Sequence, residues 1–394
     1  MNILFITNQF NPPRSTGSGR SSSLIFKELK KRNHDVDLLI FDHASKEKRY
    51  KKTKVWESYR QKNILTIIDE FKKITDGEYD IIHLYGGGPP KYILPAVCGH
   101  FKKTKLVTTF NGTSPACWHS TSYKQNSNKC CRFPKNIKCS IKSLRKRFAL
   151  FYPIVYVRNQ IRRFYTKKYD RFFSLSDSLR TLFSKAGFDK SNIDIIPNFY
   201  DQELYDEVKN FPVQKKDKTI ILYVGRIDKV KGVHNLIKAY KKINKKNKEL
   251  RMIGDGSMKK PLQIKYGDDK NIKFLGKVKY KSKEFIRNFK EADIFVHPGV
   301  WPEPFGRTIL EAAISKNAII VSDIGAPPDV LGDKALKYPP HDIESLTEIL
   351  IDLIENPEKR ELLANQAHDY IIKNYNVENS IDKLEKKYKR LIYV

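Results

Sequence analysis

Acidic residues are scarce in this sequence, and one long stretch has none. The 394 residues include 44 Asp and Glu against 75 Lys and Arg, which gives a formal net charge of +31. From Ile81 to Tyr169 no residue is acidic, whereas eighteen are Lys or Arg. An excess of this size predicts an anionic partner, whether nucleic acid, acidic lipid or a phosphorylated substrate.

Long apolar runs are also missing. No run reaches the ~18 to 20 apolar residues that span a bilayer. The short apolar stretch Asn2–Ile6 lacks the basic flank and the cleavage site of a secretory signal. We therefore expect a cytoplasmic protein. Because 40% of the residues are apolar, the chain can bury sizeable cores, and its length predicts two or three domains.

One segment of the acid-free stretch, residues 141–168, has basic flanks around an apolar and aromatic centre, Phe148–Val157. The centre is too short to cross a bilayer. Charged ends around such a centre predict a segment that lies in a membrane interface, so we expect a peripheral protein on the inner face of the cell membrane. A buried crossover helix with a solvated basic face is the alternative.

Cysteine is rare, and no Cys-x-x-Cys pair occurs. Cys98 stands alone, whereas the other four cysteines share one polar stretch with a histidine. In a cytosolic protein such a cluster indicates reduced thiols or a metal site before a disulfide. The spacing does not decide whether a metal binds. The residues concerned are Cys117, His119, Cys130, Cys131 and Cys139.

The dinucleotide-binding fingerprint is incomplete. Residues 2–8 predict a buried strand, residues 20–32 a helix and residues 35–41 a second strand, which is a βαβ opening of a doubly wound parallel sheet. The intervening loop holds Gly17 and Gly19, but no third glycine follows three residues later, which disfavours a nicotinamide cofactor. The loop is either a close-approach loop beside a substrate or an ordinary βα turn.

A second α/β series begins after a polar stretch, residues 201–218, that is typical of a linker. We therefore predict two Rossmann-like domains, residues 1–200 and 201–375, that face each other across a cleft. The final helix, 376–394, is expected to pack back on the first domain. Ligands of such sheets bind at the carboxyl ends of the strands.

Three predicted strand-end loops of the second half carry residues suited to a nucleoside diphosphate sugar. Arg226 and Lys231 supply two cations for a diphosphate. Gly254-Asp255-Gly256 offers a flat backbone surface for a ring. The third loop, Glu303–Glu311, brackets a helix start with two carboxylates, which accept sugar hydroxyls while helix amides hold phosphate. The alternatives are surface charge in a Lys-rich chain and an acidic first helical turn.

These motifs resemble the retaining glycosyltransferases of the GT-B fold, in particular their large fourth family, also called glycosyl transferases group 1. The hallmark of that family is Glu, seven residues and Glu, with Pro-Phe-Gly after the first glutamate, as in Glu303–Glu311. Gly225-Arg226 with Lys231-Gly232, Gly254-Asp255-Gly256 and Pro197-Asn198 match further family motifs, and Gly17-Ser18-Gly19 is similar to the amino-terminal glycine loop.

The resemblance implies a role for each matched residue. Arg226 and Lys231 hold the diphosphate, Glu311 binds the ribose hydroxyls and Glu303 binds the transferred sugar. The family often has a histidine where this chain has Asn111, which makes Asn111 a candidate catalytic residue whose effect on acceptor chemistry is open. Neither a metal nor a cofactor is expected, and residues 112–168 resemble a cysteine-bearing insertion. The further donor-binding candidates are Gly17, Gly19, Gly225, Gly254, Asp255, Gly256, Phe305, Gly306, Arg307 and Thr308.

The expected function is transfer of a sugar from a UDP- or GDP-sugar, with retention of configuration, to a lipid-linked glycan, a glycolipid or a surface polysaccharide precursor at the cytoplasmic membrane face. An anionic membrane surface is an expected partner, and nucleic acid is not. Two alternatives remain. One is a nucleic-acid-binding protein, for which the net charge is the argument. The other is a different GT-B enzyme, such as a nucleotide-sugar epimerase or a phosphorylase.

Overall fold

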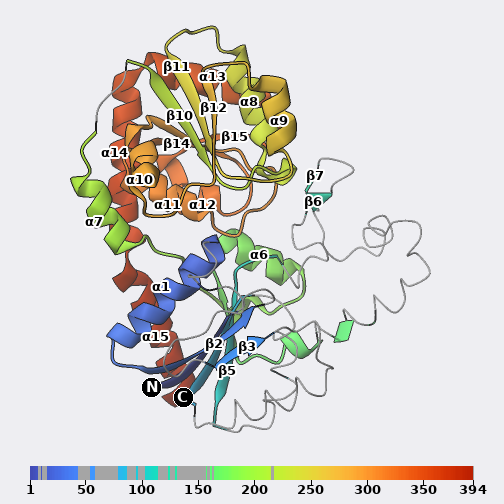
Figure 1. The fold of residues 1–394 in the computed structure, drawn as a ribbon. Coiled ribbons are helices and arrows are strands. Elements are labelled where there is room, and N and C mark those ends of the chain that lie inside the picture. The colour runs from blue at the N-terminus through green and yellow to red at the C-terminus, as the bar shows by residue number, and fades with distance from the viewer. Residues whose placement is uncertain are drawn as a thin grey trace. The chain divides into compact units, whose positions relative to one another are not determined.

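The computed structural model describes residues 1–7, 10, 16–42, 54–57, 79–86, 95, 103–113, 123–124, 129–130, 157, 160–161, 164–213 and 217–393. The chain divides into two compact units (Figure 1). The first unit consists of Met1–Ser122, Cys131–Pro197 and Ser380–Val394, and the second of Tyr123–Cys130 and Asn198–Asn379. The carboxyl-terminal residues therefore belong to the same unit as the amino terminus.

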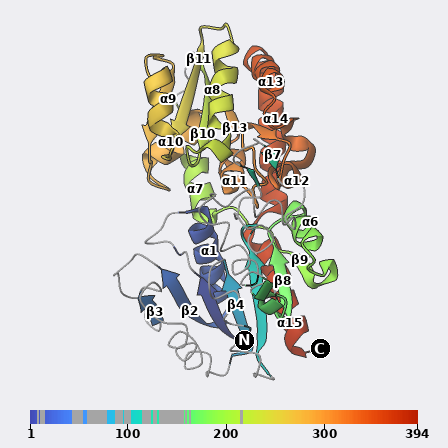
Figure 2. The ribbon, with the colours of Figure 1, turned by 90° about the vertical axis from the view of Figure 1, so that its right-hand side faces the viewer.

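The first unit contains a parallel sheet in the order β3-β2-β1-β4-β5-β8-β9 (Figure 2). From β1 the chain adds β2 and β3 on one side of the sheet and β4, β5, β8 and β9 on the other. This is the order of a doubly wound sheet, which the sequence predicted. The strands are β1 (Asn2–Thr7), β2 (Asp35–Asp42), β3 (Lys54–Glu57), β4 (Ile81–Tyr85), β5 (Lys105–Phe110), β8 (Arg171–Ser174) and β9 (Ile193–Ile195).

Helices cover both faces of this sheet. On one face, Phe110 of β5 stacks on Phe183 of α6 (Asp177–Lys185), with ring centroids 3.6 Å apart. On the other face, α15 (Val377–Tyr393) places Tyr388 against His83 of β4. Side chains of a strand alternate between the two faces, so residues on both sides of these strands are buried.

The first helix begins earlier than predicted. The sequence indicated a helix over 20–32, whereas α1 spans Gly17–Lys31 and includes the Gly17-Ser18-Gly19 loop in its first turn. Thr16 is the N-cap, and its side chain accepts a hydrogen bond from the Gly19 amide at 3.0 Å. A capped start stabilises this turn despite its glycines.

Helix α15 is tied to the first unit by polar contacts. Arg32 contacts Glu385 at 3.2 Å, His34 contacts Glu385 at 2.8 Å, and Lys387 contacts Asp194 at 2.6 Å. Together with the buried Tyr388, these contacts fix the helix on the sheet.

The second unit contains a six-stranded parallel sheet in the order β12-β11-β10-β13-β14-β15. Side chains of Ile221, Ile294 and Ile320 share one core cluster with α8 and α13, whereas Phe295 points to the opposite face and stacks on Phe289 of α10 at 6.0 Å. The strands are β10 (Thr219–Val224), β11 (Lys248–Ile253), β12 (Ile272–Gly276), β13 (Ile294–His297), β14 (Ala318–Ser322) and β15 (Leu336–Tyr338). The helices are α7 (Gln202–Asn210), α8 (Val233–Lys242), α9 (Lys259–Tyr266), α10 (Lys283–Glu291), α11 (Arg307–Ile314), α12 (Pro327–Leu331), α13 (Ile343–Glu355) and α14 (Pro357–Asn374).

The prediction of a linker over 201–218 is wrong for its first half. Residues Gln202–Asn210 form α7, and the Asp201 side chain caps it by accepting from the Leu204 amide at 3.4 Å. Leu204 and Val208, one turn apart, are buried on its inner face. Asp201 also contacts Lys281 at 2.9 Å, so α7 is fixed to the second unit.

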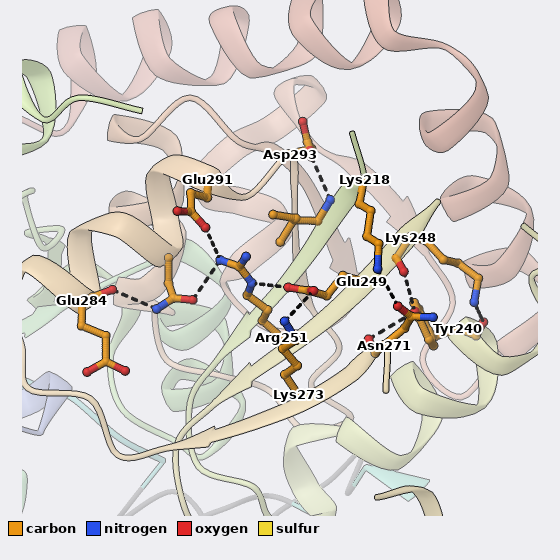
Figure 3. A network of polar contacts seen from close by, with 12 residues as sticks. Lys218, Tyr240, Lys248, Glu249, Arg251, Asn271, Lys273, Glu284, Glu291 and Asp293 are labelled. Atoms are coloured by element: carbon orange, nitrogen blue, oxygen red, sulfur yellow. Dashed lines mark hydrogen bonds and ion pairs between the residues drawn. The ribbon is translucent and has the colours of Figure 1, made fainter. Parts of the chain in front are cut away.

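A buried polar network surrounds Glu249 and Arg251 of β11 (Figure 3). Arg251 donates to Glu249 at 2.6 Å and to Glu291 at 2.7 Å, and Lys273 contacts Glu249 at 2.8 Å. Two cations thus balance two carboxylates, which burial of charge requires. The network joins β11 to β12 and to α10.

Several predictions fall outside the described residues. Cys98, Cys117, His119, Cys131 and Cys139 are among them, as is most of the segment 141–168, and Cys130 is described by its backbone alone, in a short antiparallel pair of Tyr123–Lys124 with Lys129–Cys130. In the parts of the chain that are described, no group of three or more metal-ligating side chains occurs. No helix in those parts combines the length and the apolar character that crossing a membrane requires.

Candidate functional site

The loop after β10 carries the two predicted cations. Arg226 has a side chain that is 66% exposed and contacts Asp228 at 2.6 Å. Asp228 in turn accepts hydrogen bonds from the amide and the hydroxyl of Ser257, both at 2.9 Å, so it connects this loop to the one after β11. Lys231 ends a short 3-10 turn, Lys229–Lys231, directly before α8.

Two glycines allow the strand-end loops to pack backbone against backbone. Gly232 has a φ of +66°, and a Cβ placed on it would lie 1.7 Å from the carbonyl oxygen of Pro298. Gly254 has a φ of +139°, and its Cβ would lie 1.8 Å from the carbonyl oxygen of Gly225. Any side chain at either position would therefore separate loops that now touch.

The Lys231 ammonium forms an ion pair with the Glu303 carboxylate. The two side chains are only 14% and 16% exposed. Burial alone would raise the pKa of Glu303, but the charge of Lys231 and the hydrogen bond that Lys231 donates outweigh it, so the pKa lies below its usual value. Glu303 is thus ionised at neutral pH and presents acceptor oxygens only.

His297, which the sequence analysis did not identify as a site residue, lies beneath the same loop. It ends β13, is 7% exposed, and its Nε2 atom would lie 3.6 Å from a Cβ placed on Gly306. Burial lowers its pKa to about 4, so the ring is neutral at physiological pH. The sequence signal for His297 was its position directly before the loop that carries Glu303.

Helix α11 starts at the centre of the third loop, with Gly306 as its N-cap. The side chains of its flanking residues point into the protein: Phe305 packs edge-on against Tyr375 at 6.0 Å, and the Arg307 guanidinium donates to the carbonyl of Phe199 at 3.4 Å. Since this contact occupies the Arg307 guanidinium, the backbone of Arg307 is the candidate donor-binding group. Glu311, one turn into the helix, is 3% exposed, and Thr308 is half-buried.

In the first unit, Asn111 and the glycine loop come together. Asn111 follows β5, and its side-chain amide donates to the Ser18 hydroxyl at 2.5 Å. Ser18 lies between Gly17 and Gly19 in the first turn of α1. Two segments 93 residues apart therefore meet at the carboxyl ends of β1 and β5, where parallel sheets bind ligands.

Comparison with known families agrees with this geometry. Residues 16–204 match the family described as Glycosyltransferase Family 4, and residues 205–386 match Glycosyl transferases group 1. The chain belongs to this family of GT-B glycosyltransferases, a family of retaining enzymes.

Similar proteins include an uncharacterised glycosyltransferase of Methanocaldococcus jannaschii, 27% identical over 236 residues, which are 57% of this chain and 60% of that protein. A GDP-mannose-dependent monoacylated alpha-(1-6)-phosphatidylinositol monomannoside mannosyltransferase of Corynebacterium glutamicum is 30% identical over 161 residues, 38% of this chain and 42% of that protein. The chain thus spans less than two thirds of the length of these curated relatives.

Solved structures show the same fold. HepE of Anabaena in complex with UDP-glucose has a TM-score of 0.71 at 16% identity, with 99% of this chain and 100% of that chain covered. Sucrose-phosphate synthase from Thermosynechococcus elongatus has a TM-score of 0.75, also at 16% identity, with 100% of both chains covered. The predicted fold class, α/β with two parallel sheets of the GT-B type, is confirmed.

Proposed function

We propose that the protein is a retaining glycosyltransferase that moves a sugar from a nucleoside diphosphate sugar to a hydroxyl acceptor. The observation that carries the proposal is the Lys231–Glu303 pair, in which the ends of β10 and β13 bring a cation and an ionised carboxylate together. The Lys231 cation binds a leaving diphosphate, and the Glu303 carboxylate accepts hydrogen bonds from the hydroxyls of a sugar. Family membership and the GT-B fold support the same activity.

The proposed roles follow the positions of the side chains. Lys231 and Arg226 bind the diphosphate, and Glu303 binds the transferred sugar. Backbone amides at Gly306 and Arg307, where α11 starts, face phosphate and sugar. Glu311 binds the ribose. The second unit is thus the donor side, and the first unit, with Asn111, is the acceptor side.

The reaction breaks the bond between the anomeric carbon and the diphosphate oxygen and forms a bond from that carbon to the acceptor oxygen on the same face. The acceptor proton passes to the leaving diphosphate oxygen, so no protein base is needed. The two cations stabilise the negative charge that develops on the diphosphate, a contribution that a fixed electrostatic environment makes without reorganisation. A metal ion is not required in this scheme.

We further propose that the acceptor is a lipid-linked glycan or a related surface precursor at the inner membrane face. The acid-free stretch from Ile81 to Tyr169 supports attraction to anionic lipid, since each Lys or Arg near such a surface contributes about 1 kcal/mol. The relative from Corynebacterium glutamicum is by its name a phosphatidylinositol mannoside enzyme. Sedimentation with vesicles tests this part. Binding to vesicles with 30% anionic lipid that falls with salt is expected, and equal binding to neutral vesicles would contradict it.

The activity itself is tested by incubating the protein with a panel of UDP- and GDP-sugars and measuring thermal protection and donor hydrolysis. At least one donor is expected to raise the melting temperature and to be hydrolysed slowly, with the released sugar retaining its anomeric configuration. Matched oligonucleotides serve as the control, because the net charge alone predicts binding to nucleic acid. Protection by oligonucleotide alone would contradict the proposal.

A further inference from the structure

We propose that Trp301 is a positioning residue: the face of its indole ring holds the Lys231 ammonium where it meets the diphosphate. The Lys231 Nζ atom lies 5.0 Å from the centroid of the Trp301 ring. A cation this close to a tryptophan face is attracted by the negative face of the ring. The inference rests on the proposed donor function of Lys231 and names a further residue that serves it.

Trp301 and Glu303 reach Lys231 from one tight turn. The amide of Glu303 donates to the carbonyl of Trp301 at 2.8 Å, so the two residues keep a fixed spacing. The turn is joined to the lysine's own loop, because the amide of Val300 donates to the carbonyl of Val230 at 3.0 Å and Val230 packs against Val300 and Trp301. Lys231 is thus contacted by a ring face and a carboxylate that the same backbone supports.

The contacts of Lys231 with Glu303 and with Trp301 differ in whether they occupy the N–H groups of the ammonium. A carboxylate occupies N–H groups of the ammonium and competes with phosphate for them. A ring face attracts the charge without taking up a hydrogen-bond donor, so it can keep the ammonium in place while phosphate binds. A lysine side chain otherwise loses rotamer entropy when a bound ligand fixes it. Holding Lys231 before the donor arrives therefore lowers the cost of donor binding.

The same site provides a substitution that separates this role from packing. Trp301 is 8% exposed, and its indole N–H is buried with no hydrogen-bond acceptor among the residues that the structure describes. Trp301→Phe keeps an aromatic face and removes that unpaired donor, so it leaves no polar group without a partner. Trp301→Leu keeps an apolar side chain, although a smaller one, and removes the aromatic face altogether. If the ring only filled space, both variants would affect folding more than ligand binding.

The decisive experiment replaces tryptophan by tryptophan analogues with one, two and three ring fluorines, which weaken the negative face and hardly change its size. Affinity is measured by calorimetry for UDP or GDP, whichever the wild type binds, together with the melting temperature. We expect stepwise weaker binding that totals about two- to thirtyfold, with little change in melting temperature. Trp301→Phe protein, which carries the analogues only at Trp56 and Trp118, and Lys231→Met protein are expected to show no dependence on fluorine number.

The outcomes distinguish the two proposals. If the wild type binds neither nucleotide nor any nucleotide sugar, the donor function fails, and the role of Trp301 fails with it. If the wild type binds UDP or GDP but fluorination leaves the affinity unchanged, Trp301 only packs and the present inference is overturned, whereas the donor function stands. An equal dependence in Lys231→Met protein would overturn it as well, because the ring would then act through another group.

Discussion

The two units hold their strand-end residues in different ways. In the second unit a charged pair, Lys231 and Glu303, joins two strand-end loops. In the first unit the corresponding contacts join neutral groups, since Asn111 donates to Ser18. The difference fits the two halves of a transfer reaction. A leaving diphosphate carries charge and needs fixed cations, whereas an acceptor hydroxyl needs neutral donors and acceptors at close range.

The neutral side extends into the core of the first unit. His83 contacts the Thr109 hydroxyl at 2.7 Å through Nε2 and the Tyr388 hydroxyl at 2.5 Å through Nδ1. Thr109 lies two residues before Asn111, so this buried chain of contacts fixes the end of β5. Breaking the Lys231–Glu303 pair and protonating His83 should therefore have different consequences.

The largest effect is expected from the charged pair. Lys231→Met and Glu303→Gln should each lower kcat/KM for sugar transfer by about 10²- to 10³-fold, because each removes a charge aimed at the reacting groups. The double variant should lose much less than the product of the single effects, since the two residues act as a unit. Steady-state transfer assays of the four proteins measure this.

A matched control is the pair Lys245 and Glu355 in the same unit, whose side chains are 49% and 47% exposed and lie 2.5 Å apart. An exposed pair contributes about 0 to 1 kcal/mol, so Lys245→Met and Glu355→Gln should leave transfer unchanged. Near wild-type turnover in Lys231→Met and Glu303→Gln, with melting temperatures preserved, would refute the assignment of the donor site.

The buried His83 should make the first unit sensitive to acid. Burial lowers the pKa of His83 from 6.5 to about 3. Below pH 6.5 the unfolded chain therefore binds a proton that the folded chain does not, and stability falls as pH falls. Between pH 7 and 5 we expect a loss of about 2 kcal/mol from this residue. Denaturant unfolding at both pH values measures it.

His83→Gln is the matching variant, because an amide donates and accepts hydrogen bonds but does not titrate near neutral pH. It should lose about 2 kcal/mol less than the wild type over the same pH change. His297, whose pKa burial lowers to about 4, contributes a similar slope in both proteins. An unchanged pH dependence in His83→Gln would show that His83 is accessible to protons in the folded state.

Local patterns predicted more of this molecule than contacts between distant segments. The Glu303–Glu311 loop was found because strand, turn and helix start are consecutive in the sequence. The Lys231–Glu303 pair joins residues 72 apart, and it depends on β10 and β13 being neighbours, which the alternation of strands and helices does not specify. Helix α7 was missed because only Leu204 and Val208 mark its buried face within a polar stretch. Trp301 gave no signal of its own, since its role depends on where Lys231 lies.

A smaller effect is expected at Asn111. Asn111→Asp keeps the shape of the side chain but adds a negative charge on the proposed acceptor side. Transfer should fall about tenfold, near the upper end of the range for one hydrogen bond between neutral groups, whereas the dissociation constant for UDP or GDP should stay unchanged. Ser18→Ala, which removes only the hydroxyl partner, is expected to lower transfer about threefold. An equal loss of nucleotide affinity in Asn111→Asp would instead assign Asn111 to the donor side.

A similarly small effect is expected from a substitution that separates charge from shape within the donor site. Arg226 is largely exposed and paired with Asp228, whereas Lys231 is enclosed, so the two cations should differ in their tolerance of substitution. Arg226→Lys keeps the charge and loses the planar fork that binds two phosphate oxygens. We expect the KM for the donor to rise about three- to tenfold with kcat unchanged, because the interaction is made in the ground state and in the transition state alike. Steady-state kinetics with varied donor measures both constants. A fall in kcat larger than the rise in KM would mean that the planar fork of Arg226, and not its charge alone, stabilises the charge that develops as the sugar leaves.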